Sequence, residues 1–385
     1  MDGKETNSRM KKDVAIIGGS SAGFFAAYLL AGRSCYVRVY EKEEDIHLSP
    51  RTLIVTSYMQ DLMGSLCESM VINRIGRFEL FANGRIATIS LRRPDLVIDR
   101  SKVIQRLAAQ AEANGAKVLA GHRFLNLKPN GKGLAFTVSL NGGGDLVEES
   151  ADILVGADGA FSTVAKSGGW PKQPTVPLFQ AIVELPKDMP SDATRVWFIP
   201  EDTPYFYWLI PHSPTQGVIG LIGEEGQEIR GSLERFIEKR GLVPIEFQSA
   251  RIPLYTRWIP NHRKIGESLV YLVGDAAGHV KVSTMGGIVT GFRGALGVAE
   301  AILNGGSSRE FRVLRRELDC HKLIRRVLHD FTQADYARLL DMLNLSTKRS
   351  LSVLTRDETG KLLLHAFLRQ PRLLLLALRA LLIGE

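Results

Sequence analysis

Three short segments of this chain combine glycine with an acidic residue directly after a run of apolar residues. They are residues 18–23, with Glu41 further along the chain, then Asp158-Gly159, and finally residues 275–278. Glycine allows a backbone to approach a ligand closely, and a carboxylate accepts hydrogen bonds from sugar hydroxyls. These residue types favour the binding of a nucleotide, and none of them is assigned a catalytic role.

The first segment lies within a βαβ unit. Residues 14–17 are a short apolar run typical of a buried parallel strand, and small and apolar residues continue at helical density over residues 22–30. Residues 35–40 are a second β-rich run. Gly18 allows a tight exit from the first strand, and Gly23 lets the helix lie close to the sheet. The unit therefore places a helix amino terminus at the end of the first strand.

This helix amino terminus is where we expect a pyrophosphate to bind, because unpaired N–H groups and the helix dipole attract anions. Glu41 ends the second strand and is placed to accept hydrogen bonds from an adenosine ribose. The middle glycine of the usual G-x-G-x-x-G pattern is Ser20, so the backbone approaches the phosphate less closely there. We predict cofactor contacts from Gly18, Ser20, Ser21, Ala22, Gly23, Glu41 and Lys42.

The composition is typical of a globular chain, because 45% of the residues are hydrophobic and 23% are charged. Its length of 385 residues is sufficient for two or three domains. The net charge of +8 is modest, and much of it lies after Ser307. Those arginines form either a solvated helical face or a surface with weak attraction to anionic lipid or acidic substrates. No basic run with interleaved aromatic residues occurs, so a nucleic-acid partner is not expected.

The cysteines are scattered without a C-x-x-C spacing, so neither a disulfide framework nor a metal site is predicted, and a reducing compartment fits. Residues 1–10 are polar and lack the apolar core of a secretory signal. No run of about 18 uncharged apolar residues exists, so a spanning helix is not expected. We expect a cytoplasmic protein, with peripheral membrane contact as an alternative.

The rest of the chain alternates between two kinds of pattern. Residues 71–90 alternate apolar and polar residues around Asn83-Gly84, a strong hairpin signal. Buried strands that run into turns recur at residues 153–159 and 268–275. Between them, residues 171–177 read as a linker and residues 178–254 as an antiparallel sheet interrupted by one helix. Helical patterns dominate beyond residue 307. The sheet is thus inserted into the nucleotide-binding part.

Taken together, these segments resemble the FAD-dependent oxidoreductases of the glutathione-reductase-like and p-hydroxybenzoate-hydroxylase-like fold, and within them the geranylgeranyl reductase family. The resemblance covers nearly the whole chain. It implies an α/β fold: a three-layer Rossmann-like FAD-binding domain, an inserted antiparallel-sheet substrate domain and a C-terminal helical region. The corresponding boundaries are residues 10–74, 95–170 and 266–306 for FAD binding, 75–94 and 171–265 for the substrate domain, and 307–385 for the helices.

The resemblance also assigns cofactor contacts. Asp158 and Gly159 match the family's D-G-x-x-S-x-V-R segment, in which Ala165 replaces the usual arginine. GDAAGHVKVSTMGGIVTG matches the second flavin segment, in which Asp275 bonds the ribityl chain. The resemblance implies that the backbone at Gly286, Gly287 and Ile288 lies beside the isoalloxazine and stabilises the reduced ring. The remaining contacts that the family pattern implies come from Arg100, near the FAD phosphates, and Gly278.

The chain departs from the family pattern at three further places. Val282 stands where proline is usual, and Met285 replaces a glycine, so that its side chain can crowd the isoalloxazine. The redox cysteine that the family carries after the second strand has no counterpart in residues 46–56. Cys67 comes later and is interpreted as a buried apolar residue.

The substrate side is assigned to the stretch YFYWLIP, which resembles the family's Y-x-W-x-F-P-K segment. Tyr205, Phe206, Trp208, Pro211 and Met285 are predicted to line a long apolar tunnel, although Trp208 fits plain sheet core equally well. The same stretch fits the W-x-W-x-I-P pattern of flavin-dependent halogenases apart from its first tryptophan. Those enzymes need a lysine near the tunnel, and no segment is found that supplies one.

Two further groups of residues receive structural interpretations. His212 and His279 are interpreted as ordinary surface or loop histidines rather than acid–base groups. Residues 373–383 are apolar except for Arg379 and too short to span a bilayer. They form either a core-packing helix or an interfacial helix that brings the active site to lipid substrates, and both interpretations stay open.

The resemblance implies a reductase of C=C bonds in an isoprenoid or other lipid. FAD is reduced by NADPH or another external electron donor and passes hydride to one carbon, while a proton from an unassigned donor or from water reaches the other. The first alternative is an FAD-dependent monooxygenase or halogenase on the same fold. The second is a non-catalytic flavin- or lipid-binding protein, which purified protein without yellow colour would favour.

Overall fold

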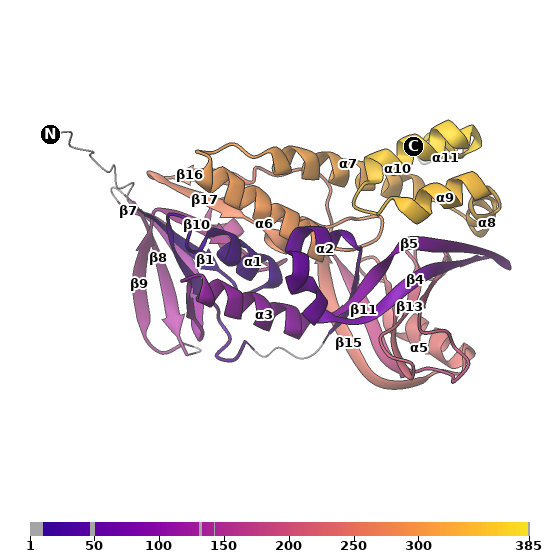
Figure 1. Cartoon of the computed structure of the whole chain (residues 1–385), viewed down its shortest axis with the longest axis horizontal. Coiled ribbons are helices and arrows are strands. Elements are labelled where there is room, and N and C mark those ends of the chain that lie inside the picture. Colours follow the sequence, from indigo (N-terminus) through magenta and orange to yellow (C-terminus); the bar gives the residue numbers. More distant parts are fainter. Residues whose placement is uncertain (1–10, 47–50, 131–132, 142, 384–385) are drawn as a thin grey trace.

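A computed structural model describes residues 11–46, 51–130, 133–141 and 143–383. Within them the strands form a six-stranded, an eight-stranded and a three-stranded sheet. Figure 1 shows the six-stranded sheet and its helices at one end of the molecule, the large curved sheet at the other, and the C-terminal helices lying along the top. The predicted fold class is confirmed.

The six-stranded sheet has the order β16-β17-β10-β1-β2-β6. All its neighbouring pairs are parallel except β16 with β17. Its strands in this order are β16 (His262–Ile265), β17 (Ser268–Leu272), β10 (Ile153–Gly156), β1 (Lys12–Ile17), β2 (Cys35–Tyr40) and β6 (Lys117–Leu119). The three strands that precede the glycine–acid segments are therefore immediate neighbours.

Both faces of this sheet are covered, which explains why β1 is apolar throughout. Val14 and Ile16 join the core beneath helices α1 (Ser21–Leu30), α3 (Arg100–Ala113) and α6 (Ile288–Leu303). Ala15 and Ile17 face the opposite core, which the three-stranded sheet covers. That sheet consists of β7 (His122–Asn130), β8 (Gly133–Leu140) and β9 (Leu146–Ala151), and α4 (Thr163–Ser167) lies against β7.

The eight-stranded sheet has the order β15-β11-β14-β13-β12-β4-β5-β3 and is antiparallel except where β12 meets β4. Helix α5 (Ile229–Lys239) packs its apolar face on the side of the sheet that carries Tyr207 and Leu209. The strands are β3 (Thr52–Val55), β4 (Val71–Ala82), β5 (Arg85–Asp99), β11 (Thr175–Glu184), β12 (Ala193–Trp197), β13 (Tyr207–Pro211), β14 (Gln216–Ile222) and β15 (Val243–Pro253).

The predicted hairpin at Asn83-Gly84 is confirmed, since β4 pairs with β5 and both turn residues have positive φ. The linker predicted at residues 171–177 is wrong in its second half. Thr175 already pairs with Pro253 in the sheet. Pro177 lies within the same strand, where its missing N–H does not prevent the pairing. The predicted domain boundaries stay a prediction. β3 and the end of β5, which were assigned to the FAD-binding domain, pair with each other within the eight-stranded sheet.

Beyond residue 308, the described residues form five helices: α7 (Arg309–His329), α8 (Gln333–Asp341), α9 (Leu345–Val353), α10 (Thr359–Arg369) and α11 (Pro371–Ile383). Residues of α7, α8 and α11 pack on the β4–β5 hairpin through a small core that includes Ala82, Tyr336 and Leu376. The remaining elements are α2 (Tyr58–Met63) and the 3-10 turns η1 (Gly64–Met70) and η2 (Gly274–Ala277). None of the helices in the described part of the chain is long and apolar enough to cross a membrane.

Candidate active site

The three glycine–acid corners meet at one edge of the six-stranded sheet. A Cβ atom added to Gly18 would lie 2.6 Å from the carbonyl oxygen of Ala157, so the first corner touches the second. A Cβ atom added to Gly274 would lie 3.0 Å from the Cβ of Ala22, so the first corner also touches the third. The three corners are therefore neighbours at this edge of the sheet, which is where the sequence predicts the FAD groove.

The first corner explains why serine is accepted in the glycine pattern. Ser20 is the N-cap of α1, and its Oγ accepts a hydrogen bond of 3.2 Å from the N–H of Gly23. Gly18 has a φ of +104°, and a Cβ on Gly23 would lie only 2.2 Å from its carbonyl oxygen. Ser21 and Ala22 form the buried first turn of the helix. The remaining N–H groups of that turn are the donors available to an anion.

Glu41 lies at the end of β2, where its carboxylate joins two loops. Oε2 accepts a hydrogen bond of 2.6 Å from the N–H of Gly19, and Oε1 accepts one of 3.0 Å from the N–H of Glu43. These bonds hold the carboxylate against the first corner, beside the predicted groove. Lys42 is exposed and pairs with Glu43 at 3.2 Å, so it lies on the protein surface.

Asp158 shapes the second corner through hydrogen bonds of its own. Its two carboxylate oxygens accept from Ser162 Oγ at 2.5 Å and from the N–H of Val164 at 3.0 Å. Burial raises the pKa of Asp158, whereas these hydrogen bonds lower it. Gly159 follows with a φ of +83°. Both oxygens are engaged within the loop, so Asp158 fixes the loop backbone.

The third corner brings Asp275 to the amino terminus of α6. A Cβ atom on Gly287 would lie 3.3 Å from Asp275 Oδ1, so this carboxylate faces the segment of Gly286, Gly287 and Ile288. Burial raises the pKa of Asp275, and the charges of Arg100 and Arg51 lower it. Gly278 turns the chain away with a φ of +67°. Arginines from two distant segments thus converge on this acid.

Arg51 supplies a direct test of whether the groove suits a dinucleotide. Its Nε is buried and has no hydrogen-bond partner among the described residues, and burial together with the charge of Arg100 lowers its pKa. A buried N–H donor without a partner is unfavourable unless a ligand completes it. An anionic group such as a phosphate would do so. Together with the N–H groups at the start of α1, this donor suits the phosphates of FAD.

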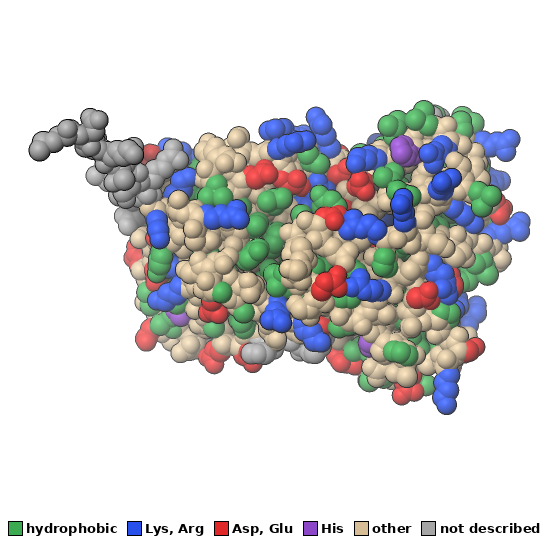
Figure 2. All heavy atoms as spheres, in the orientation of Figure 1, with side chains coloured by type: hydrophobic (Ala, Val, Ile, Leu, Met, Phe, Trp, Pro, Cys, Tyr) green, Lys and Arg blue, Asp and Glu red, His purple; other side chains and the backbone are tan. Residues whose placement is uncertain are grey.

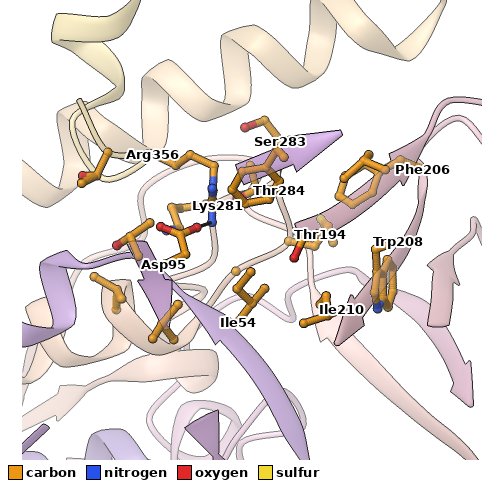
Figure 3. A pocket seen from close by; sticks show the side chains of 18 of the residues that line it. Ile54, Asp95, Thr194, Phe206, Trp208, Ile210, Lys281, Ser283, Thr284 and Arg356 are labelled. Atoms are coloured by element: carbon orange, nitrogen blue, oxygen red, sulfur yellow. Dashed lines mark hydrogen bonds and ion pairs between the residues drawn. The ribbon is translucent and has the colours of Figure 1, made fainter. Parts of the chain in front are cut away.

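A cavity of about 440 Å³ continues from the α6 end of this groove. Phe206, Trp208 and Ile210 line it, and they alternate along the chain with Tyr207 and Leu209, which face the core on the other side of the sheet. Figure 3 shows these three apolar side chains grouped at one end of the cavity. Alternation along this stretch therefore separates the cavity wall from the core on the other side of the sheet.

Two other predicted substrate residues differ in whether they line the cavity. Tyr205 lines the cavity, and the guanidinium of Arg325 lies 4.1 Å above its ring centre. Pro211 lies outside the residues that form the cavity wall. Its carbonyl instead accepts a hydrogen bond of 2.9 Å from the side-chain amide of Asn73. Gly220 makes room for the Trp208 ring, because a Cβ there would lie 2.5 Å from a ring carbon.

Met285 lines the cavity next to Gly286 and has a φ of +53°, a left-handed conformation that side chains rarely adopt. Replacing Met285 with valine should strain this backbone by about 1–3 kcal/mol and displace the flavin loop, because a β-branched residue tolerates positive φ poorly. We expect FAD to bind at least about tenfold more weakly in Met285→Val, as measured by quenching of flavin fluorescence. Met285→Gly is the control and should bind FAD like the parent, so equal affinities in all three proteins would contradict the assigned role of this loop.

Comparison with known proteins supports the binding of FAD. A family profile described as an FAD binding domain matches residues 11–304. The chain belongs to the FAD binding domain family. It is accordingly an FAD-dependent oxidoreductase, and the predicted cofactor is confirmed.

Relatives of this oxidoreductase align along most of its length. A digeranylgeranylglycerophospholipid reductase from Methanococcus aeolicus is 23% identical over 94% of this chain and 96% of its own. A geranylgeranyl diphosphate reductase from Rhodobacter capsulatus is 27% identical over 80% and 79%. These names agree with the family resemblance seen in the sequence.

Solved structures show the same fold at lower identity. A geranylgeranyl bacteriochlorophyll reductase-like protein from Thermoplasma acidophilum superposes with a TM-score of 0.77, covering 97% of this chain and 99% of its own at 19% identity. A flavin-dependent brominase superposes with a TM-score of 0.67, covering 92% and 93% at 17% identity. The fold alone therefore accommodates both reductases and halogenases.

One expectation about the cavity is wrong: a lysine does reach it. Lys281 lies in the quoted flavin segment, is 5% exposed and lines the cavity. Asp95 and Arg356 lie on the same wall. Periodicity gave no signal for these residues, because each comes from a different part of the chain and a charged residue in a glycine-rich loop usually faces solvent.

His279 lies in the loop after η2, as expected, but it is buried there rather than on the surface. Its side chain is 1% exposed, stacks on Trp258 at 5.6 Å and has a buried Nδ1 without a partner among the described residues. Burial lowers its pKa to about 3, so the ring is neutral at physiological pH. His212 does lie in the turn after β13, as expected. Cys67 is fully buried, which raises its pKa to about 11, so it is the apolar core residue predicted from the sequence.

Proposed function

We propose that this oxidoreductase reduces C=C bonds in an isoprenoid or another lipid. The observation that carries the proposal is the cavity: it is lined mostly by apolar side chains and begins at the Gly286–Gly287 backbone of the FAD groove. A long hydrocarbon offers few groups for hydrogen bonding, so its affinity has to come from buried apolar area. The two relatives named above support the same substrate class.

When bound, FAD supplies the hydride, and NADPH or another external donor restores it. The chain itself contributes position and water exclusion. Phe206, Trp208 and Ile210 hold the hydrocarbon against the sheet, while residues of α9 and α10 cover the other side of the cavity. Orientation of two reactants in a dry cavity is sufficient to lower the barrier to hydride transfer by several kcal/mol.

Anaerobic single turnover tests the proposal. The purified FAD protein is photoreduced and mixed with a geranylgeranyl lipid in detergent, and flavin reoxidation and lipid mass are followed. We expect the flavin to reoxidise without oxygen and the lipid to gain two mass units per turnover. Reoxidation that requires oxygen, with an unchanged lipid in its absence, would contradict the proposal.

An oxygen-using reaction is the second candidate. Two observations favour it: halogenases share the fold, and Lys281 reaches the cavity. The same purified protein, reduced and exposed to oxygen with bromide and an aromatic substrate, would then yield brominated product. Rapid loss of reduced flavin to hydrogen peroxide without product would count against this candidate.

We also propose that α10 and α11 rest on an anionic membrane. Leu364, Leu368, Leu375 and Leu378 are exposed, and residues 345–383 carry seven basic but only two acidic residues. Figure 2 shows hydrophobic and basic side chains mixed over this part of the surface, at the upper right. Val353 of α9 is both exposed and part of the cavity wall, so this surface adjoins the cavity. Mixed apolar and basic faces suit the interface of anionic lipids.

Replacing Leu375, which is 66% exposed, with glutamate should weaken binding to vesicles of equal phosphatidylcholine and phosphatidylglycerol by about tenfold or more. The reason is that about 1.5–3 kcal/mol of apolar burial is lost and a like charge is added. Co-sedimentation measures the effect. Leu146 of β9 is 67% exposed at the far end of the molecule, so Leu146→Glu is the matched control and should bind normally. Equal loss in both variants would exclude a specific surface.

A further inference from the structure

Lys281 is a buried charge in the wall of an otherwise apolar cavity. Its side chain is 6% exposed, and Nζ lies 2.8 Å from Asp357 Oδ1, whose own side chain is fully buried. Two buried charges are costly to desolvate even when paired, and hydrophobic residues of the same size often serve stability as well. Buried ionisable groups in a cavity of this kind are therefore candidates for a role in the reaction.

Other polar groups hold the pair in place. Asp357 Oδ2 also accepts a hydrogen bond from Thr56 Oγ1, and Arg356 pairs with Asp95 at 2.5 Å on the same wall. Figure 3 shows Lys281, Asp95 and Arg356 together at the end of the cavity opposite Phe206 and Trp208. The two positive and two negative charges at this end of the cavity balance each other. They form one polar end of a largely apolar cavity.

Lys281 lies directly beside the backbone that borders the FAD groove. A Cβ atom added to Gly286 would be 3.2 Å from Lys281 Cε and 3.8 Å from Nζ. An ammonium group has three N–H donors, and among the described residues Asp357 is the acceptor that the structure gives to Nζ. The other donors are free to serve a group inside the cavity.

We propose that Lys281 is the proton donor of the reduction, with Asp357 as the residue that positions it. This inference rests on the proposed function. Lys281 Nζ gives its proton to the alkene carbon that does not receive the hydride.

The step is balanced in atoms and electrons. Reduced FAD, as the hydride source, loses two electrons and one hydrogen to the first carbon. The π pair of the alkene supplies the electrons of the new C–H bond at the second carbon, and one N–H bond of Lys281 breaks. Lys281 is left as a neutral amine beside Asp357 and regains its proton from water.

Other polar groups near Gly286 are less suited to this step. Thr284 Oγ1 is buried without a hydrogen-bond partner among the described residues, but an aliphatic hydroxyl is a far weaker acid than an ammonium group. Arg356 does not release its proton in proteins, and it is already bonded to Asp95. Lys281 thus combines acidity with adjacency to the groove.

The surroundings of Lys281 adjust its acidity in opposite directions. Burial lowers its pKa and Arg356 lowers it further, whereas Asp357 and Asp95 raise it, with a net lowering. His321 of α7, whose pKa burial lowers to about 3, is neutral and adds no charge. A lowered pKa makes the ammonium group a better proton donor at physiological pH.

The experiment is anaerobic single turnover of the photoreduced protein with a geranylgeranyl lipid, as a function of pH. In the parent, the reoxidation rate should fall as pH rises through the pKa of Lys281. We expect Lys281→Met to be at least about 100-fold slower without this pH limb. We expect the same loss in Lys281→Arg, which keeps the charge but holds its proton. Lys264→Met, at an exposed lysine paired with Glu267, is the control and should match the parent.

Two readouts separate a proton donor from a structural ion pair. Methylammonium added to Lys281→Ala should restore turnover in proportion to its concentration, whereas a structural role predicts no rescue. In protein labelled with [ε-¹³C]lysine, the NMR signal missing from Lys281→Arg should titrate below those of surface lysines. A signal that titrates with the surface lysines would overturn the proposal.

The outcomes also distinguish this proposal from the proposed function. If the parent protein does not reduce the lipid at all, the proposed function fails. If the parent reduces it and Lys281→Met or Lys281→Arg does so at the parental rate, only the proton donor fails. FAD binding is measured for each variant, and Lys281→Met/Asp357→Asn provides a neutral pair if the single variant does not fold.

Discussion

Replacing Gly23 with alanine should severely weaken FAD binding. The added Cβ would lie 2.2 Å from the carbonyl oxygen of Gly18 and 3.0 Å from the Cβ of Ala157, and the first of these contacts is with backbone that cannot rotate away. Helix α1 must therefore move off the sheet, which opens the contact between the first two corners. We expect FAD affinity to fall at least about 100-fold, or about 3 kcal/mol, in a fluorescence titration.

A matched glycine identifies what is specific to this position. Gly360 lies in the first turn of α10, where an added Cβ would be 3.6 Å from the nearest neighbouring atom, an ordinary contact. Gly360→Ala should therefore bind FAD like the parent and gain slightly in helix stability. Near-parental FAD binding by Gly23→Ala would mean that the groove does not depend on the close approach of α1 to the sheet.

The FAD groove could be predicted because its determinants are local in sequence. A buried strand, a glycine turn and a helix form a unit within 30 residues, and parallel pairing brings the ends of β1, β10 and β17 to one edge. Even Ser20 follows a local rule, since serine is a favoured N-cap. Arg51 follows no such rule. It reaches Asp275 from a distant segment, and its role appears only in the buried Nε that lacks a partner.

The polar end of the cavity could not be predicted for a related reason. Lys281 and Asp357 are 76 residues apart, and Arg356 and Asp95 are 261 apart. No periodicity links such pairs, because their contact depends on how the C-terminal helices settle on the sheet. By contrast, the aromatic end was predictable from alternation along one strand, where Phe206, Trp208 and Ile210 share a face.

Removing the charge of Asp357 should destabilise the protein more than any surface substitution. Asp357→Asn leaves the Lys281 ammonium group buried without a counter-ion, because its remaining neighbours of opposite sign are engaged elsewhere, as Asp95 is with Arg356. Breaking a buried pair on one side costs about 3–5 kcal/mol. We expect a loss of this size in the free energy of unfolding by urea, with loosening first in the 354–359 segment that crosses the cavity.

The pH dependence of this loss follows from the direction of the shift. Lys281 is the main charge that lowers the pKa of Asp357 below its ordinary value, against the effect of burial. The unfolded chain therefore binds the proton more readily, so the stabilisation is complete above the ordinary carboxyl pKa of about 4 and is lost as pH falls through the lower folded value. The difference between parent and Asp357→Asn should shrink in that acid range.

The double variant shows whether the pair stabilises the fold or exists for the chemistry. Lys281→Met/Asp357→Asn removes both charges, so no ion is left buried, and neutral replacement of a buried pair is often close to neutral in stability. We expect it to recover at least about 2 kcal/mol of the loss in Asp357→Asn, measured in the same urea titration. Recovery of stability without recovery of turnover would mean that the two charges are kept for catalysis. A double variant as unstable as Asp357→Asn would instead make the pair a structural joint between the C-terminal helices and the FAD groove.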